Sequence, residues 1–368
     1  MKRFWAKISL FLPTFFLWVI TIFLVIYLSI QFLPWQPSFP YYGDISGYGR
    51  FIATFAHFDG IHYLRLIEHG YRDVGSQAFF PVYPLLIRVL TFGYFDPLLT
   101  SIVINSILVV GSLYLVSLML PRSAFTRFVL LFLAFPTSFY LIFNYTESLF
   151  IFLLLLFFHL LSKKSYLASA LVAGIASGTR LVGVFLAISL VIDMIKNKKS
   201  IFSIIGMFTI SLTGLMSYMY YLNLKFGDPL MFVHVQTMFG AGRSGGDIVL
   251  LPQVIYRYIK IFFTVSPFSL LYLRAAWEFI LFGLSIIVLY LYRHRISLPV
   301  MFFCILSILL PTLSGTLSSI PRYLLVIIPL LAGAVEDHIN QSFWVIFSIE
   351  YAMLSIALAL FVQGIFVA

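Results

Sequence analysis

Ionisable side chains gather in one short segment of this chain, residues 56–86, which reads AHFDGIHYLRLIEHGYRDVGSQAFFPVYPLL. Asp59 precedes His62 and Tyr63 by three and four residues, so on a helix the three side chains share one face. A carboxylate held there can act as a general base that takes a proton from a hydroxyl group. The alternative is structural, because an aspartate before GIHYLRLIEHG is well suited to cap that helix. Capping explains Asp59 without catalysis but does not exclude it.

Three further charged residues stand at the edges of apolar runs or inside them. Arg322 follows Pro321, and a proline at a helix start, free N–H groups and an arginine together make an anion site. The alternative for Arg322 is an arginine that snorkels to the bilayer interface. Arg180 lies inside an apolar segment, where a charge costs roughly 3 kcal/mol unless paired or hydrated, so a functional role is the default. Its expected partners are Glu147, a lipid phosphate or the carbonyls of a broken helix. Glu147 opens an apolar run, where a carboxylate also favours the helix dipole without any further role.

Gln236 and Arg243 share a polar, glycine-containing loop, in which Gln236 can hydrogen-bond a sugar or simply be solvated. The three histidines of the first polar segment are five and seven residues apart, on different helical faces, which argues against a shared zinc site. No cofactor is required, and a divalent cation on Asp59, Glu68 or Glu147 stays an open alternative. The sequence contains no G-x-S-x-G, H-E-x-x-H or P-loop motif.

The composition of the chain indicates that the candidate residues are positioned by helices in a membrane. The 368 residues are 62% hydrophobic and only 10% charged, with a mean hydropathy of +1.05. So few charges cannot cover the surface of a soluble protein of this size. Lys and Arg, which give a net charge of +10, cluster in short segments beside apolar runs. This pattern is typical of topology signals and not of nucleic-acid binding.

We therefore expect an all-α polytopic membrane protein with one domain over residues 1–368. Basic flanks place the N-terminus in the cytoplasm and residues 34–97 in a long outer first loop. About eleven membrane-embedded segments are expected from runs of roughly 20 apolar residues, near 8–33, 98–120, 128–143, 149–161, two half-helices within 166–195, 201–223, 275–292, 298–313, 321–335 and 343–363. The half-helices are expected to break at SGTR, with Thr179 and Arg180 at the tip, because lysines flank both ends of a segment too short for two crossings. One tilted crossing is the alternative. Apart from Arg180, the candidate residues then share the outer side, around one polar cavity.

Five separated stretches resemble, in order, signatures of the GPI mannosyltransferase II family and its prokaryotic relatives, within the GT-C superfamily of integral membrane glycosyltransferases. They are HFDGIHYLRLIEHGY with AFFPVYPLLIR, FPTSFYLIFNYTESLFIFL, ASGTRLVGVFL, GDPLMFVHVQTMFGAGR and IPRYLLVIIPLLAG. The family has a tryptophan where this chain has Phe58. The chain is also short beside the eukaryotic enzymes, and nothing marks it for the endoplasmic reticulum. These departures favour a prokaryotic plasma membrane.

The resemblance implies a GT-C-like bundle and inverting transfer of a sugar, mannose by preference, from a polyprenyl-phosphate donor. The acceptor hydroxyl, on a lipid, glycan or protein, is reached on the outer face. The resemblance implies that Asp59 is the catalytic base and that Arg322 binds the donor phosphate. Substrate-binding roles are expected for His62, Arg65, Glu147, Arg180, Gln236, Arg243, Arg322 and Tyr323. The alternatives are a flippase or transporter for lipid-linked sugars and a noncatalytic subunit of a glycosylation complex.

Overall fold

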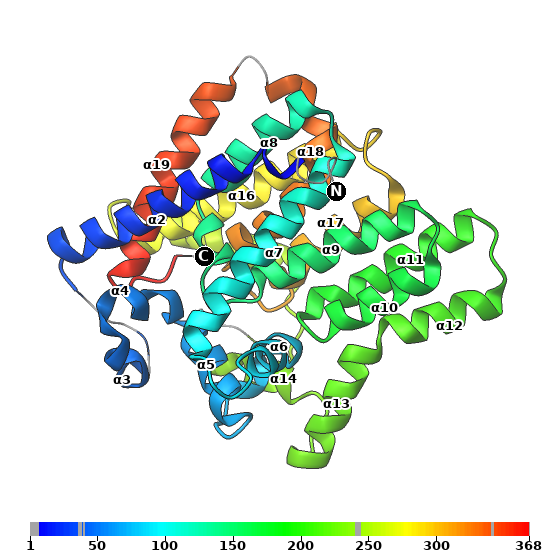
Figure 1. Ribbon diagram of the computed structural model, residues 1–368, viewed down its shortest axis with the longest axis horizontal. Coiled ribbons are helices and arrows are strands. Elements are labelled where there is room, and N and C mark those ends of the chain that lie inside the picture. Colours follow the sequence, from blue (N-terminus) through cyan, green and yellow to red (C-terminus); the bar gives the residue numbers. More distant parts are fainter. Residues whose placement is uncertain (1–6, 36–38, 40, 240–243, 340–341, 368) are drawn as a thin grey trace. The chain divides into compact units, whose positions relative to one another are not determined.

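The computed structural model describes residues 7–35, 39, 41–239, 244–339 and 342–367. Every regular element in these residues is a helix, which confirms the expected all-α class. The α-helices labelled in Figure 1 are α2 (Leu12–Phe32), α3 (Tyr42–Ile45), α4 (Gly49–Ala53), α5 (Asp59–His69), α6 (Val82–Leu90), α7 (Pro97–Met119), α8 (Arg122–Ala134), α9 (Glu147–Ser162), α10 (Tyr166–Ser177), α11 (Phe185–Lys196), α12 (Ile201–Ser211), α13 (Thr213–Phe226), α14 (Met231–His234), α16 (Leu270–Leu291), α17 (Leu298–Thr312), α18 (Ile320–Ile339) and α19 (Phe343–Val362), and α15 spans Leu251–Thr264. Short 3-10 turns are η1 (Ser46–Tyr48), η2 (Thr54–Ala56), η3 (Ser76–Ala78), η4 (Ser138–Leu141), η5 (Leu181–Val184) and η6 (Val235–Phe239).

Four of these helices, α2, α7, α16 and α19, are long and apolar enough to cross a membrane. The pair α12 and α13 makes a fifth candidate if the two count as one span, bent by 52°. Shorter apolar helices are α9, α10, α17 and the 320–335 part of α18. These helices are those of a multi-pass membrane protein. The expected total of about eleven embedded segments and the GT-C bundle stay predictions.

One expected span has a different form. The sequence predicted a helix over 128–143, but α8 ends at Ala134. Phe135, which precedes Pro136, has an extended backbone (φ −56°, ψ 136°), as expected for a residue before proline. The chain then continues through the buried turn η4 to the NYTES segment. The prediction of a helix to residue 143 was therefore wrong.

The chain forms two compact units. The first comprises Met1–Gly70, Tyr83–Leu156 and Ile328–Val367, and the second comprises Tyr71–Val82 and Phe157–Ile327. In the first unit α2 packs against α8 and α19. The Trp18 indole donates to the Ser138 hydroxyl at 3.2 Å, and the Gln363 amide donates to the Ser29 carbonyl at 2.6 Å. In the second unit α10, α11, α12 and α17 pack together.

The second unit contains the predicted break at SGTR. Helix α10 ends at Ser177, and Arg180 is extended before η5 and α11 continue the chain. Close backbone contact with α13 explains the glycines, because a Cβ on Gly214 would lie 2.2 Å from the Gly174 carbonyl oxygen and 2.5 Å from the Gly178 nitrogen. The two helices α10 and α11 lie against each other as a hairpin, so the break is confirmed. The depth of this hairpin in a membrane stays a prediction.

Candidate functional site

Asp59 is the first residue of α5, in the first unit. Phe58, and not Asp59, stands at the N-cap position of α5, and the Asp59 charge in the first turn favours the helix dipole. Phe58 has φ 54° and ψ −118°, a conformation that costs a non-glycine residue about 1–3 kcal/mol. Three rings hold it there, with centroids 4.6 Å (Phe39), 5.0 Å (Phe361) and 5.1 Å (Phe366) from that of Phe58. The backbone before Asp59 is thus fixed in a strained form.

The NYTES segment binds the backbone on both sides of Asp59. The Tyr145 hydroxyl donates to the His57 carbonyl at 2.7 Å, and the Asn144 side-chain amide donates to the Gly60 carbonyl at 2.8 Å. The Asn144 backbone N–H also donates to the Phe55 carbonyl at 2.8 Å. The side chains of Asn144 and Tyr145 are fully buried. The first two sequence stretches of the resemblance therefore meet at the candidate base.

A buried polar network extends this contact to two more elements. The Tyr83 hydroxyl, from the PVYP stretch, donates to the Asn144 side-chain oxygen at 3.0 Å. Asn105, in the middle of the apolar helix α7, donates to the Tyr83 hydroxyl at 3.0 Å, and its amide also contacts the Phe143 carbonyl. All three side chains are fully buried. Buried amides and phenols need such partners, so the network specifies how α6, α7 and NYTES fit together.

The other candidates of the first loop, Arg65 and His62, both contact the Tyr41 ring. The Arg65 guanidinium forms an ion pair with Asp44 and lies over the Tyr41 ring, 4.3 Å from its centroid. The His62 ring meets the same Tyr41 ring edge-to-face at 5.6 Å. Arg65 thus has a carboxylate partner 21 residues away in sequence. The expected role of Arg65 and His62 in binding substrate stays a prediction.

Glu147 is fully buried in the first turn of α9, directly after NYT. Glu147 therefore follows closely after Asn144 and Tyr145, which bind the backbone on both sides of Asp59. Its charge also acts on Tyr83: burial is the main cause that raises the pKa of the Tyr83 phenol, and the Glu147 charge adds to it. The Tyr83 hydroxyl therefore stays protonated and remains a hydrogen-bond donor in the network.

In the second unit the structure brings Arg180 and Tyr323 together. The Arg180 guanidinium lies over the Tyr323 ring, 5.5 Å from its centroid. Arg322 is only 6% exposed in the first turn of α18. Ser319, whose carbonyl accepts from the Arg322 backbone N–H at 3.0 Å, has φ 72°. Tyr323 therefore has Arg180 against its ring and Arg322 as its neighbour in sequence.

The buried segment before Arg322 is held by α15 and α16. The Tyr258 hydroxyl accepts from the Leu317 backbone N–H at 3.0 Å and donates to the Glu278 carboxylate. The Arg257 guanidinium donates to the Gly315 carbonyl at 3.0 Å. Glu278 is 3% exposed and also lies 3.4 Å from the Arg274 guanidinium. Sequence reasoning missed this group, although an acidic residue inside a long apolar helix was the signal for it.

Gln236 lies in η6, where its side-chain amide donates to the Phe232 carbonyl at 3.1 Å. His234, in the same loop, contacts the Asp228 carboxylate at 2.7 Å. Arg243 lies outside the described residues. Among the residues that the structure describes, no group of three His, Cys, Asp or Glu side chains is placed to hold a metal ion.

Burial also sets the charge of His57, two residues before Asp59. The His57 side chain lies among aromatic rings that include Trp35 and Phe39, at 5.5 and 4.7 Å. Burial is the main cause that lowers the pKa of His57 to about 4; the hydrogen bond to the Phe361 carbonyl opposes it, and the nearby Arg50 charge adds to it. Its Nδ1 atom lies 3.2 Å from the Phe361 carbonyl. His57 is therefore neutral at physiological pH.

Compared with known proteins, the chain matches no family model, no curated protein and no solved structure. Its relation to the GPI mannosyltransferase II family therefore rests on the five sequence stretches and is a proposal.

Proposed function

We propose that this protein is an integral membrane glycosyltransferase of the GT-C type, which moves a sugar from a polyprenyl-phosphate donor to an acceptor hydroxyl. The proposal places it in a prokaryotic plasma membrane, with about eleven embedded segments and the active site on the outer face. Mannose is the first sugar to test. The acceptor is a lipid, a glycan or a protein.

One observation carries the proposal. Asn144 and Tyr145 bind the backbone on both sides of Asp59. The buried Tyr83 hydroxyl holds the Asn144 side chain, and the Asn105 amide in turn donates to the Tyr83 hydroxyl and the Tyr145 carbonyl. A carboxylate that only favours the dipole of α5 from its first turn needs no such support. A general base does need it, since a reacting group must be held in one geometry by its surroundings. The contacting stretches are also those that carry the resemblance.

The proposed reaction is a single displacement. Asp59 takes the proton of the acceptor hydroxyl while the hydroxyl oxygen forms a bond to the anomeric carbon. The bond between that carbon and the phosphate oxygen breaks on the opposite face, so the configuration inverts. The polyprenyl phosphate leaves with the electron pair and its negative charge, so no general acid is required. Stabilising this charge is the main electrostatic task of the protein.

We assign that task to Arg322, which lies in the first turn of α18, and to Arg180, whose guanidinium lies over the ring of the neighbouring Tyr323. Guanidinium groups suit phosphate because they present several donors in a fixed plane. Further contacts to donor or acceptor are proposed for the other residues of the matched stretches, namely His62, Arg65, Glu147, Gln236 and Arg243.

The test is transfer from labelled polyprenyl-phosphate mannose by the purified protein in lipid, with a membrane extract as acceptor source. The proposal predicts a labelled product whose anomeric configuration is opposite to that of the donor. Transfer with retained configuration would contradict the single displacement. No transfer from mannose, glucose or other polyprenyl sugars, by a folded protein with acceptor present, would contradict the enzyme and favour the flippase or the noncatalytic subunit.

A further inference from the structure

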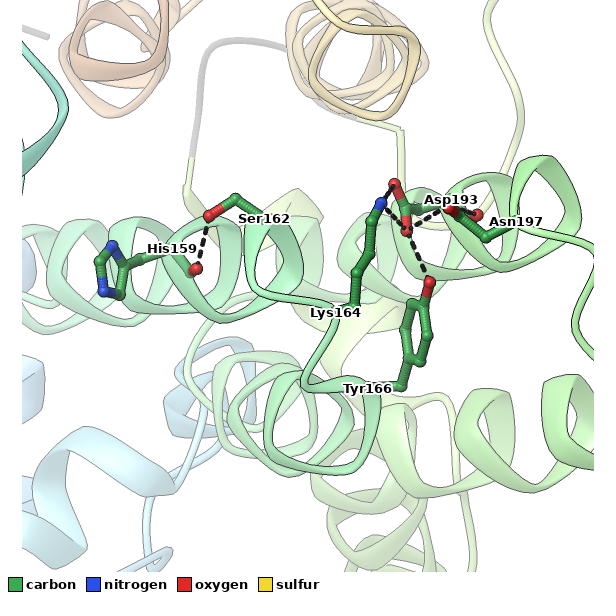
Figure 2. Close-up of polar contacts among 6 residues, drawn as sticks. All are labelled: His159, Ser162, Lys164, Tyr166, Asp193 and Asn197. Carbon is green, nitrogen blue, oxygen red and sulfur yellow. Dashed lines mark hydrogen bonds and ion pairs between the residues drawn. The ribbon is translucent and has the colours of Figure 1, made fainter.

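Five lysines surround two neighbouring turns of the second unit. All five are exposed: Lys163 and Lys164 lie between α9 and α10, Lys196 ends α11, and Lys198 and Lys199 lie between α11 and α12. The turns are far apart in sequence, but Asp193 joins them. Figure 2 shows the Lys164 ammonium and the Tyr166 hydroxyl pointing at the Asp193 carboxylate, at 2.9 and 3.2 Å. We call these five residues the lysine patch.

The backbone of both turns is fixed. The Ser165 N–H donates to the Leu160 carbonyl at 3.1 Å, and the Lys199 N–H donates to the Met194 carbonyl at 3.0 Å. The Lys199 ammonium also lies 5.3 Å from the centre of the Tyr166 ring. The patch is therefore a built surface with five positive charges, of which the Lys164 ammonium is paired with the Asp193 carboxylate.

Exposed apolar side chains flank the lysines. Leu167 is 54% exposed, Ile195 61%, Ile201 60% and Phe202 84%. Ammonium groups next to exposed aliphatic and aromatic side chains are the arrangement of a bilayer interface, where the apolar groups enter the acyl boundary and the lysines reach the headgroups. This combination favours a lipid surface over a nucleic acid or a soluble anion as the partner.

We propose that the lysine patch binds the phosphate groups of anionic phospholipids in the leaflet that these two turns face. A lysine near an anionic membrane surface strengthens binding by about fivefold, and the effect weakens with salt because the charges are exposed. The proposal concerns a surface and does not depend on the proposed glycosyl transfer.

The test is competitive retention of phosphatidylglycerol and phosphatidylcholine by the full-length protein, measured by native mass spectrometry after extraction from mixed vesicles. The variant is Lys163→Gln/Lys196→Gln/Lys198→Gln, which keeps the Lys164–Asp193 pair and the Lys199–Tyr166 contact. The matched control removes three exposed cations that lie outside the patch, Arg88→Gln/Lys260→Gln/Arg295→Gln.

We expect wild type and control to retain phosphatidylglycerol preferentially, and the lysine variant to lose about a hundredfold in that preference at low salt. Lys198→Gln alone should lose about fivefold, which gives a readout even if the triple variant folds poorly. Equal losses in the lysine variant and the control would overturn the proposal. So would equal retention of the two lipids by the wild type.

Discussion

Replacing Tyr83 by phenylalanine tests the network that holds the candidate base. The change removes one oxygen atom from a fully buried ring, so it creates almost no cavity. Two hydrogen bonds of 3.0 Å disappear, one to the Asn144 side-chain oxygen and one from the Asn105 amide. A buried hydrogen bond contributes about 0.5–1.5 kcal/mol, so the free energy of unfolding should fall by about 1–3 kcal/mol.

The assay is unfolding in mixed micelles with increasing sodium dodecyl sulfate, followed by circular dichroism, with Tyr94→Phe as the control. Tyr94 is 92% exposed, so its substitution should change the free energy of unfolding by less than about 0.5 kcal/mol. Asn144→Ala combined with Tyr83→Phe should give less than the sum of the single losses, because the two changes share one bond. Equal stability of the Tyr83 and Tyr94 variants, or strict additivity with Asn144→Ala, would refute the reasoning.

Two further predictions concern stability. His57 has an ordinary pKa of 6.5 that folding lowers to about 4. As pH falls between these values only the unfolded chain binds this proton, so the free energy of unfolding should drop by up to about 3 kcal/mol. His57→Phe should remove that part of the pH dependence, whereas the control His69→Gln, at an exposed site, should not. Thermal melts across this pH range check the prediction. Gly214→Ala should lower the melting temperature, because its Cβ would lie 2.2 Å from the Gly174 carbonyl, whereas Gly206→Ala, with nothing within 4 Å, should not. The His57 prediction fails if both histidine variants keep the full pH dependence, and the Gly214 prediction fails if the two alanine variants melt together.

The long helices could be predicted from the sequence because hydropathy and charge mark their ends. The span expected at 98–120 is α7, Pro97–Met119, and the span expected at 343–363 is α19, Phe343–Val362. The lysines on both flanks also predicted the break at SGTR. The bend between α12 and α13 was not predicted, because it lies where Gly214 meets α10, and such a tertiary contact leaves no periodic signal in the sequence.

The candidate base was found from its charge, but its support was not. Asn105, Tyr83 and Asn144 are uncharged and lie in apolar surroundings, so the search for ionisable groups passed over them. Asn105 was nevertheless a signal, since a buried amide in an apolar helix requires partners. The pairing of Arg65 with Asp44 joins residues of one loop through the folded backbone, and spacing alone does not reveal it.

The central claim is that Asp59 is the catalytic base, and the most direct measurement is sugar transfer by Asp59→Asn with donor binding measured on the same preparation. The control is Asp247→Asn, which removes an exposed carboxylate from the loop that also contains Gln236. The account predicts that Asp59→Asn binds polyprenyl-phosphate mannose as the wild type does but loses at least about a hundredfold in turnover, the usual contribution of a general base. The control should keep both properties. Transfer by Asp59→Asn at the wild-type rate would contradict the account.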